Sequence, residues 1–276
     1  MEDHIREIKR IMVKHKCSTV ICAGDIFHKW NSPPELVNFA IEKLPKMYAI
    51  PGNHDLPEHN YADIHKSSYW TLVMAGVVRH LPMGEPVRIH RNTNITGFPE
   101  GLCSVKATHL QESHIKLIHI AIVHDYCWMK GHSFPGCPKE KHVSEQAHEL
   151  KELGFTAGVF GDNHRGFLYK GSRNPDVLNV GGFIRRNSDE KDRILQIGLL
   201  YDDGTIGVEI VQSEDEWEEE IMSLPVESRV EVQVLMEALS GLKSQTFDFG
   251  DAVRECIKKH NLPSPVRRIL LRSIEK

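Results

Sequence analysis

The chain contains 276 residues, of which 40% are hydrophobic and 26% charged, and its net charge is −4. This size suits one large α/β domain with a small appendage. The acidic balance excludes a nucleic-acid interaction driven by the field of the whole protein. No apolar run approaches a membrane span and no secretory signal opens the chain. We therefore expect a cytoplasmic protein without membrane contact, whose six cysteines are reduced.

Predicted strands and helices alternate through the first 160 residues. Short apolar runs rich in β-branched residues predict buried strands over residues 18–23, 47–50, 116–123 and 157–160. Apolar residues at helical spacing, in one case after a proline pair, predict helices over residues 3–15, 33–44 and 144–153. This alternation is typical of an α/β fold.

The rest of the chain predicts a hairpin followed by a tail. Asp202-Asp203-Gly204 is a strong turn signal between two predicted strands. The composition changes at Ser213, where a mostly acidic run precedes three helical patterns. We therefore expect an α/β domain over residues 1–212 and a small helical C-terminal tail over residues 213–276.

Four short polar segments recur along the chain, and three of them follow a stretch of β-branched or small apolar residues. They are Gly24-Asp25-Ile26-Phe27-His28, Gly52-Asn53-His54-Asp55, Val123-His124-Asp125 and Gly161-Asp162-Asn163-His164. Open α/β sheets carry their chemistry at the carboxyl ends of the strands, so we expect these segments to meet at one rim. Each segment alone is as typical of a turn or a capped strand end as of a site. Their joint occurrence indicates a metal-assisted phosphoester hydrolase.

Hydrolysis of a phosphodiester near neutral pH needs an activated nucleophile and neutralised charge, which two metal ions about 3.5–4 Å apart supply. Oxygen and nitrogen ligands of the kinds found here suit Mn, Fe or Zn better than Ca. The candidate ligands are Asp25, Asn53, His124, Asp162 and His164. His54 is placed to protonate a leaving alkoxide, and Asp55 to hold His54 in one orientation.

The segments Gly24 to His28, Pro33-Pro34 and Ile50 to Asp55 resemble the calcineurin-like metallophosphoesterases. Within them they look closest to the Mre11/SbcD branch of DNA repair nucleases, including its phage-type members. The resemblance implies a four-layer sandwich of two mixed β-sheets flanked by helices. It also implies two divalent metal ions, usually manganese, with magnesium, iron and zinc as alternatives.

The resemblance implies a role for each site residue. Asp25 would bridge the two metals, with Asn53 and His124 on one metal and His164 on the other. His54 would be the general acid. His28 stands where this branch carries a residue near the scissile phosphate.

The chain departs from the family pattern in two places. The last family motif usually has His where Asp162 stands, and aspartate shifts the preference toward Mn or Mg. The family opens with a strand carrying Asp-x-His, whereas this chain starts on the following helix. One metal is then left with only Asp25 and His164, so we expect an incomplete second site and impaired activity. A truncation, an internal start and a split partner are the alternatives.

Three functions remain open from the sequence. The first is a metal-dependent DNA nuclease or phosphodiesterase, with DNA as substrate. The second is a small-molecule or phosphoprotein phosphatase. The third is a catalytically weakened binding subunit of a nuclease–ATPase complex, with an SbcC/Rad50-type ATPase as partner. A homodimer and the choice between exonuclease and endonuclease also stay open. Arg185 and Arg186 are candidates for a phosphate clamp, with a solvated pair at a strand end as the alternative.

Overall fold

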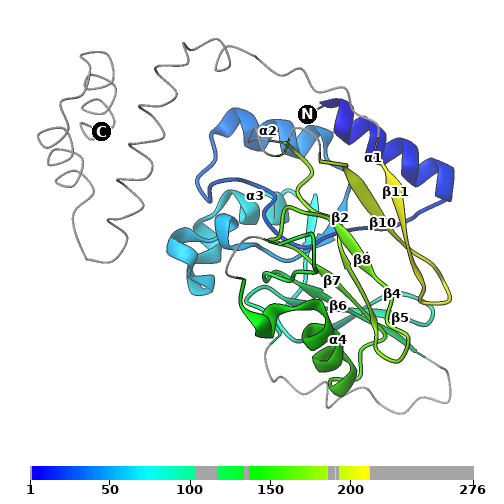
Figure 1. Cartoon of the computed structure of the whole chain (residues 1–276). Helices are drawn as coiled ribbons and strands as arrows, with labels where there is room; N and C mark the ends of the chain where they lie inside the picture. Colours follow the sequence, from blue (N-terminus) through cyan, green and yellow to red (C-terminus); the bar gives the residue numbers. More distant parts are fainter. Residues whose placement is uncertain (1, 103–116, 134–136, 186–189, 191–192, 212–276) are drawn as a thin grey trace, which may run out of the picture. The chain divides into compact units, whose positions relative to one another are not determined.

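The computed structural model describes residues 2–102, 117–133, 137–185, 190 and 193–211. These residues form a mixed α/β structure with two main sheets, one hairpin and helices on the outer faces (Figure 1). The predicted domain boundary after residue 212 and the predicted helical tail over residues 213–276 lie outside the described residues. Within the described residues, no helix is both long and apolar enough to cross a membrane.

The helices agree closely with the predicted ranges. The α-helices are α1 (Glu2–His15), α2 (Pro34–Lys43), α3 (Ser68–Met74) and α4 (Val143–Glu152). Short 3₁₀ helices are η1 (Asn53–Asp55), η2 (Pro57–His59), η3 (Tyr61–Lys66) and η4 (Lys139–Lys141). Pro34 stands in the first turn of α2, where its missing N–H has no helical partner to lose.

The two main sheets consist mostly of parallel strands. The first sheet is parallel and has the order β1 (Val20–Cys22), β2 (Met47–Ala49) and β3 (Val78–His80). The second has the order β4 (Pro86–His90), β5 (Thr93–Phe98), β6 (Ile118–Val123), β7 (Ala157–Phe160), β9 (Asp176–Asn179) and β8 (Phe167–Tyr169). Its inner strands are parallel, and its two edge strands β4 and β8 run antiparallel. The second sheet is therefore mixed, as predicted, whereas the first is parallel throughout its described strands.

A separate antiparallel hairpin joins β10 (Gln196–Leu200) to β11 (Ile206–Ile210). Its turn contains Asp203, which accepts hydrogen bonds from the backbone N–H and the hydroxyl of Thr205. The turn predicted from Asp202-Asp203-Gly204 is confirmed. The hairpin packs with α1 through a cluster of buried side chains, and Figure 1 shows the two elements side by side. The members of that cluster are Ile11, Leu195, Leu199 and Val211.

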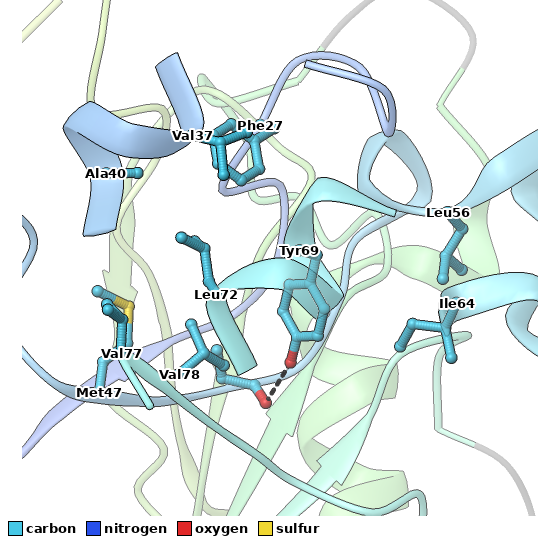
Figure 2. Close-up of a cluster of buried hydrophobic side chains, with 11 residues drawn as sticks. Phe27, Val37, Ala40, Met47, Leu56, Ile64, Tyr69, Leu72, Val77 and Val78 are labelled. Atoms are coloured by element: carbon cyan, nitrogen blue, oxygen red, sulfur yellow. Dashed lines mark hydrogen bonds between the residues drawn. The ribbon is translucent and has the colours of Figure 1, made fainter. Parts of the chain in front are cut away.

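Besides the cluster under α1, the period-two alternation of the strands divides the described core into three clusters and the domain into four layers. Side chains of β1 and β2 that face outward pack under α2 and α3, in the cluster shown in Figure 2. Those that face inward, Ile21 and Tyr48, belong to the cluster of Ile120 and Ile122 of β6 between the two sheets. On the far face of the second sheet, Val123 and its neighbours pack against α4. The order helices, sheet, sheet, helix is the predicted four-layer sandwich.

A partly buried hydrogen-bond chain ties α3 to the end of β2. The hydroxyl of Tyr69 donates to the carbonyl oxygen of Ala49 over 2.9 Å (Figure 2). The same hydroxyl lies 3.0 Å from Nδ1 of His80, and the Tyr61 hydroxyl lies 2.9 Å from Nε2 of that ring. Because the Tyr69 proton is given to Ala49, its oxygen accepts from Nδ1 of His80. Burial lowers the pKa of His80, so the ring is held neutral.

Candidate metal centre

The four polar segments leave the carboxyl ends of four parallel strands. The first two follow β1 and β2, and the other two follow β6 and β7. Backbone hydrogen bonds continue the ladder into the loops: Gly161 N–H donates to the carbonyl oxygen of Val123 over 2.8 Å. The rim predicted from the order of the strands therefore exists, and it spans both sheets.

Three acidic or imidazole side chains converge at this rim. Asp25, His124 and Asp162 each offer one ligand atom, and these atoms all lie within 4.8 Å of one another. Oδ1 of Asn53 lies 3.0 Å from Nε2 of His124, and Oδ1 of Asp25 lies 3.5 Å from the same nitrogen. The structure thus brings together four of the five predicted ligands.

The tautomer of His124 favours a cation at this cluster. Nδ1 of His124 lies 2.7 Å from the carbonyl oxygen of Ala23, which can only accept, so Nδ1 carries the proton. In the neutral ring Nε2 then carries a lone pair, and it faces the carboxylate oxygen of Asp25 and the amide oxygen of Asn53. Acceptor atoms that converge in this way suit a divalent ion, and the O/N set fits Mn, Fe or Zn.

Two of the ligand-bearing residues have unusual backbone conformations. Asp25 has φ 54° and Asp162 has φ 71°, both in the left-handed region that side chains rarely adopt. Partial burial and the nearby Asp25 charge raise the pKa of Asp162, while His124 acts in the opposite direction. Local strain and like charge held together are typical of a functional site.

Glycines of three segments make the close approach of the loops feasible. A Cβ on Gly52 would lie 2.0 Å from Oδ1 of Asp25, and one on Gly161 would lie 2.3 Å from the carbonyl oxygen of Ala23. Gly24 has φ +99°, and its Cβ would lie 2.4 Å from Nδ1 of His124. Each glycine therefore leaves the space that a ligand or its supporting carbonyl occupies.

Asp55 joins the first two loops. It is fully buried, and its carboxylate accepts hydrogen bonds from the backbone N–H groups of Ile26, Phe27 and Gly52 over 3.1, 2.9 and 3.0 Å. Burial raises the pKa of Asp55 to about 6, against the lowering effect of these amides. Among the described residues its hydrogen bonds go to backbone amides, so Asp55 orders the loop that carries His54 and not the His54 ring.

The predicted general acid His54 and the predicted phosphate-side histidine His28 lie side by side on the exposed edge of the rim. The ring centroids of His28 and His54 are 5.2 Å apart. The backbone N–H of His54 donates to Oδ1 of Asp25 over 3.1 Å, which places this loop against the ligand cluster. Both side chains are exposed and so are accessible to a substrate.

His164 lies apart from the ligand cluster. Among the described residues, the group that lies within 4.8 Å consists of Asp25, His124 and Asp162, without His164. Its Nδ1 lies instead 2.9 Å from Oε1 of Glu190. Sequence reasoning missed Glu190, because this residue lies in an irregular segment where neither strand nor helix periodicity marks it.

Two polar residues beside the cluster, His59 and Glu100, were not found from the sequence. A cleft of about 240 Å³ beside the cluster is lined by Asn53, Leu56, His59, Pro99, Glu100, His124, Asp125 and Asp162. His59 touches the site through Nδ1, which lies 3.1 Å from the carbonyl oxygen of Asn53. No motif contains His59 or Glu100.

Two buried asparagines hold the last loop. Asn163 donates from Nδ2 to the carbonyl oxygens of Cys127 and His132, over 2.8 and 2.9 Å. Asn179, at the end of β9, donates to the carbonyl oxygen of Asn163 over 2.7 Å. The position of Asn163 between two predicted ligands was the available signal. Of the predicted phosphate clamp, Arg185 donates from Nε to the carbonyl oxygen of Arg193 over 2.8 Å, and Arg186 lies outside the described residues.

One family of known proteins matches the part of the chain that forms this site. The sequence model described as calcineurin-like phosphoesterase matches residues 1–166, a range that contains all four polar segments. A search of the curated proteins found no match. Among solved structures the chain is similar to the crystal structure of TT1561 of Thermus thermophilus, with 12% identity and a TM-score of 0.49, covering 77% of this chain and 95% of that chain.

Proposed function

Because the chain belongs to the calcineurin-like phosphoesterase family, we propose that it is a metal-dependent phosphodiesterase that cleaves DNA, as a nuclease of the Mre11/SbcD type. The family supports hydrolysis of phosphoric esters with divalent metals. The narrower proposal of a nuclease depends on the Phe27-His28 and Pro33-Pro34 context of the sequence. It depends equally on how the histidines are arranged.

The observation that carries the proposal is the pair of exposed imidazoles beside the ligand cluster. An alkoxide such as a deoxyribose oxygen is a poor leaving group and needs a proton as its bond to phosphorus breaks. The ring centroids of His54 and His28 lie 5.2 Å apart, and the backbone N–H of His54 donates a hydrogen bond to Oδ1 of Asp25. We infer that His54 donates this proton and that His28 contacts the phosphate.

The residues of the cluster define what a bound metal would do there. Asp25, Asn53, His124 and Asp162 would hold a divalent cation, most suitably Mn²⁺ for a set with two carboxylates. Such a cation supplies an activated nucleophile and neutralises charge on the phosphate. The Ala23 carbonyl keeps the His124 tautomer that binds it, and Asp55 keeps the His54 loop in place.

A phosphatase acting on small phosphomonoesters is the second candidate. The cleft beside the cluster is small, at about 240 Å³, and it carries the acidic side chain of Glu100. This volume is close to the lower end of the range of small-molecule pockets, about 300 Å³, and the acidic side chain repels the many phosphates of a duplex more than a single phosphate group. This cleft favours a compact monoester over a duplex.

The test uses the full chain, stripped of metal and reloaded with Mn²⁺. Single- and double-stranded DNA, bis-p-nitrophenyl phosphate and p-nitrophenyl phosphate are compared as substrates. We expect cleavage of DNA and of the diester, abolished by EDTA and reduced by His54→Ala. His148→Ala, which removes an exposed histidine of α4, is the matched control. Faster hydrolysis of the monoester selects the phosphatase, and no hydrolysis by the Mn²⁺-loaded chain contradicts both functions.

A further inference from the structure

We propose that Glu190 is the positioning residue for His164, holding its ring with the proton on Nδ1 and the lone pair on Nε2. This inference rests on the proposed function, because it assumes that Nε2 of His164 is a ligand of the second metal ion. It adds a residue that no motif contains.

The contact that carries the inference is between a buried carboxylate and an exposed ring. Oε1 of Glu190 lies 2.9 Å from Nδ1 of His164 and 2.9 Å from Nη1 of Arg193. The side chains of Glu190 and Arg193 are only 8% and 9% exposed, whereas that of His164 is 60% exposed. An ionised carboxylate can only accept, so Nδ1 of His164 must be the donor.

Arg193 pairs with Glu190 and is itself held in place. Its Nη2 donates to the carbonyl oxygen of Ile184 over 2.8 Å, and its backbone N–H donates to that of Glu190 over 3.0 Å. A Cβ on Gly182 would lie 3.2 Å from both terminal guanidinium nitrogens, so glycine leaves room for this ion pair. A carboxylate held by a buried guanidinium is a preorganised acceptor.

The backbone holds the two segments together independently of the side chains. The N–H of Gly182 donates to the carbonyl oxygen of His164 over 3.2 Å. Gly181 has φ +81°, and a Cβ there would lie 2.6 Å from the same oxygen. The backbone of His164 is therefore held without Glu190, so the contact with Glu190 acts on the orientation and the tautomer of the His164 ring.

The chemistry of metal-binding histidines explains why the ring matters. Such histidines donate the second ring N–H to a carboxylate or a carbonyl, which selects the tautomer and raises the basicity of the ligand nitrogen. His124 has this arrangement with the Ala23 carbonyl, and His164 has it with Glu190. His164 lies two residues after Asp162, a member of the ligand cluster. Glu190 thus does for one histidine what a backbone carbonyl does for the other.

The first test reads the tautomer directly in the metal-free full chain. Long-range ¹H–¹⁵N correlation spectra at a pH where the imidazole is neutral distinguish the two forms. We expect the Nδ1–H form for His164 in the wild type and a shift toward the Nε2–H form in Glu190→Ala, with rescue by Glu190→Gln, whose amide oxygen still accepts. Asp176→Ala, which breaks the comparable ion pair with Lys170, is the control and leaves His164 unchanged. An Nε2–H form in the wild type overturns the inference.

The second test measures Mn²⁺ binding without catalysis, by the electron paramagnetic resonance signal of free Mn²⁺. Loss of such a partner weakens metal binding by about 10–100-fold. We expect Glu190→Ala and His164→Ala to weaken binding at the same site, and the double variant to be no weaker than His164→Ala. Additive losses show that Glu190 acts elsewhere and contradict the inference. If the tautomer and the Mn²⁺ binding are as expected but the chain hydrolyses none of the substrates, the role of Glu190 is supported and the proposed function is contradicted.

Discussion

Nε2 of His124 and Oδ1 of Asn53 lie 3.0 Å apart, although 71 residues separate them in the chain. The Ala23 carbonyl holds the proton of the His124 ring on Nδ1. In the neutral ring, Nε2 of His124 and Oδ1 of Asn53 are therefore both hydrogen-bond acceptors. Two acceptors at this distance repel unless a cation or a proton lies between them. This pair of atoms therefore favours the binding of a cation, and the first two predictions follow from it.

Divalent metal should stabilise the folded chain through this cluster. At Mn²⁺ concentrations about 100 times the dissociation constant, the free energy of unfolding should rise by about 2.7 kcal/mol. Asp25→Ala removes a ligand and should abolish most of this increase, measured by urea unfolding with and without Mn²⁺. Glu42→Ala, an exposed carboxylate of α2, is the control. If Mn²⁺ raised the free energy of unfolding of Asp25→Ala as much as that of the wild type, the metal would bind elsewhere.

Asp162→Asn should separate metal binding from stability. The Asp162 carboxylate is partly desolvated and lies near Asp25, and both effects raise its pKa, so its charge opposes folding in the metal-free chain. The neutral variant should be at least as stable as the wild type without metal. Its affinity for Mn²⁺, measured by isothermal titration calorimetry, should fall by about tenfold, equivalent to about 1.4 kcal/mol. A variant that loses stability without metal would contradict this account.

Gly52→Ala should disturb the ligand directly. The new Cβ would lie 2.0 Å from Oδ1 of Asp25 and 2.5 Å from its backbone nitrogen, so Asp25 must move. Overpacking of this kind costs about 1–3 kcal/mol, and both thermal stability and Mn²⁺ binding should fall. In Gly207→Ala the nearest atoms are the end of the Tyr201 side chain at 3.1 Å, which can give way. Equal behaviour of the two variants would show that the loops are not closely packed.

The half-buried ring of His80 should make the first sheet sensitive to acid. Burial lowers the pKa of His80 in the folded state, so the unfolded chain takes up the proton first. Stability should therefore fall as the pH drops through the unfolded value near 6.5 and stay constant above it. His80→Asn does not titrate, and its stability should depend less on pH between about 5 and 7. Parallel pH profiles in urea unfolding would refute the assignment.

His54→Ala should affect poor leaving groups most. Loss of a general acid lowers the rate by about 10²–10⁴-fold when the leaving oxygen needs a proton. A p-nitrophenolate leaving group needs little protonation, so hydrolysis of bis-p-nitrophenyl phosphate should fall much less than cleavage of DNA. The comparison of kcat for the two substrates provides the measurement. A uniform loss would assign His54 to binding and not to proton transfer.

Local patterns in the chain were enough to predict α1, α2, α4, the four strands that carry the site, the final hairpin and the kinds of chemical group at the site, whereas α3 and strands β3, β4, β5, β8 and β9 were not predicted. The unbroken apolar run of β6, the proline pair before α2 and the Asp203 turn each encode their element through neighbours in the chain. The order of the four polar segments also predicted which strand ends carry ligands. These signals are legible because periodicity and turn chemistry act over a few residues.

The pairing of these groups became visible only in the folded protein. Asp55 bonds to amides 28 and 29 residues away, His124 to a carbonyl 101 residues away, and His164 to Glu190 across 26 residues. Such pairs depend on how two sheets pack face to face and on where irregular loops fold back. No local pattern specifies that packing, since burial and long-range contact, and not propensity, place these side chains.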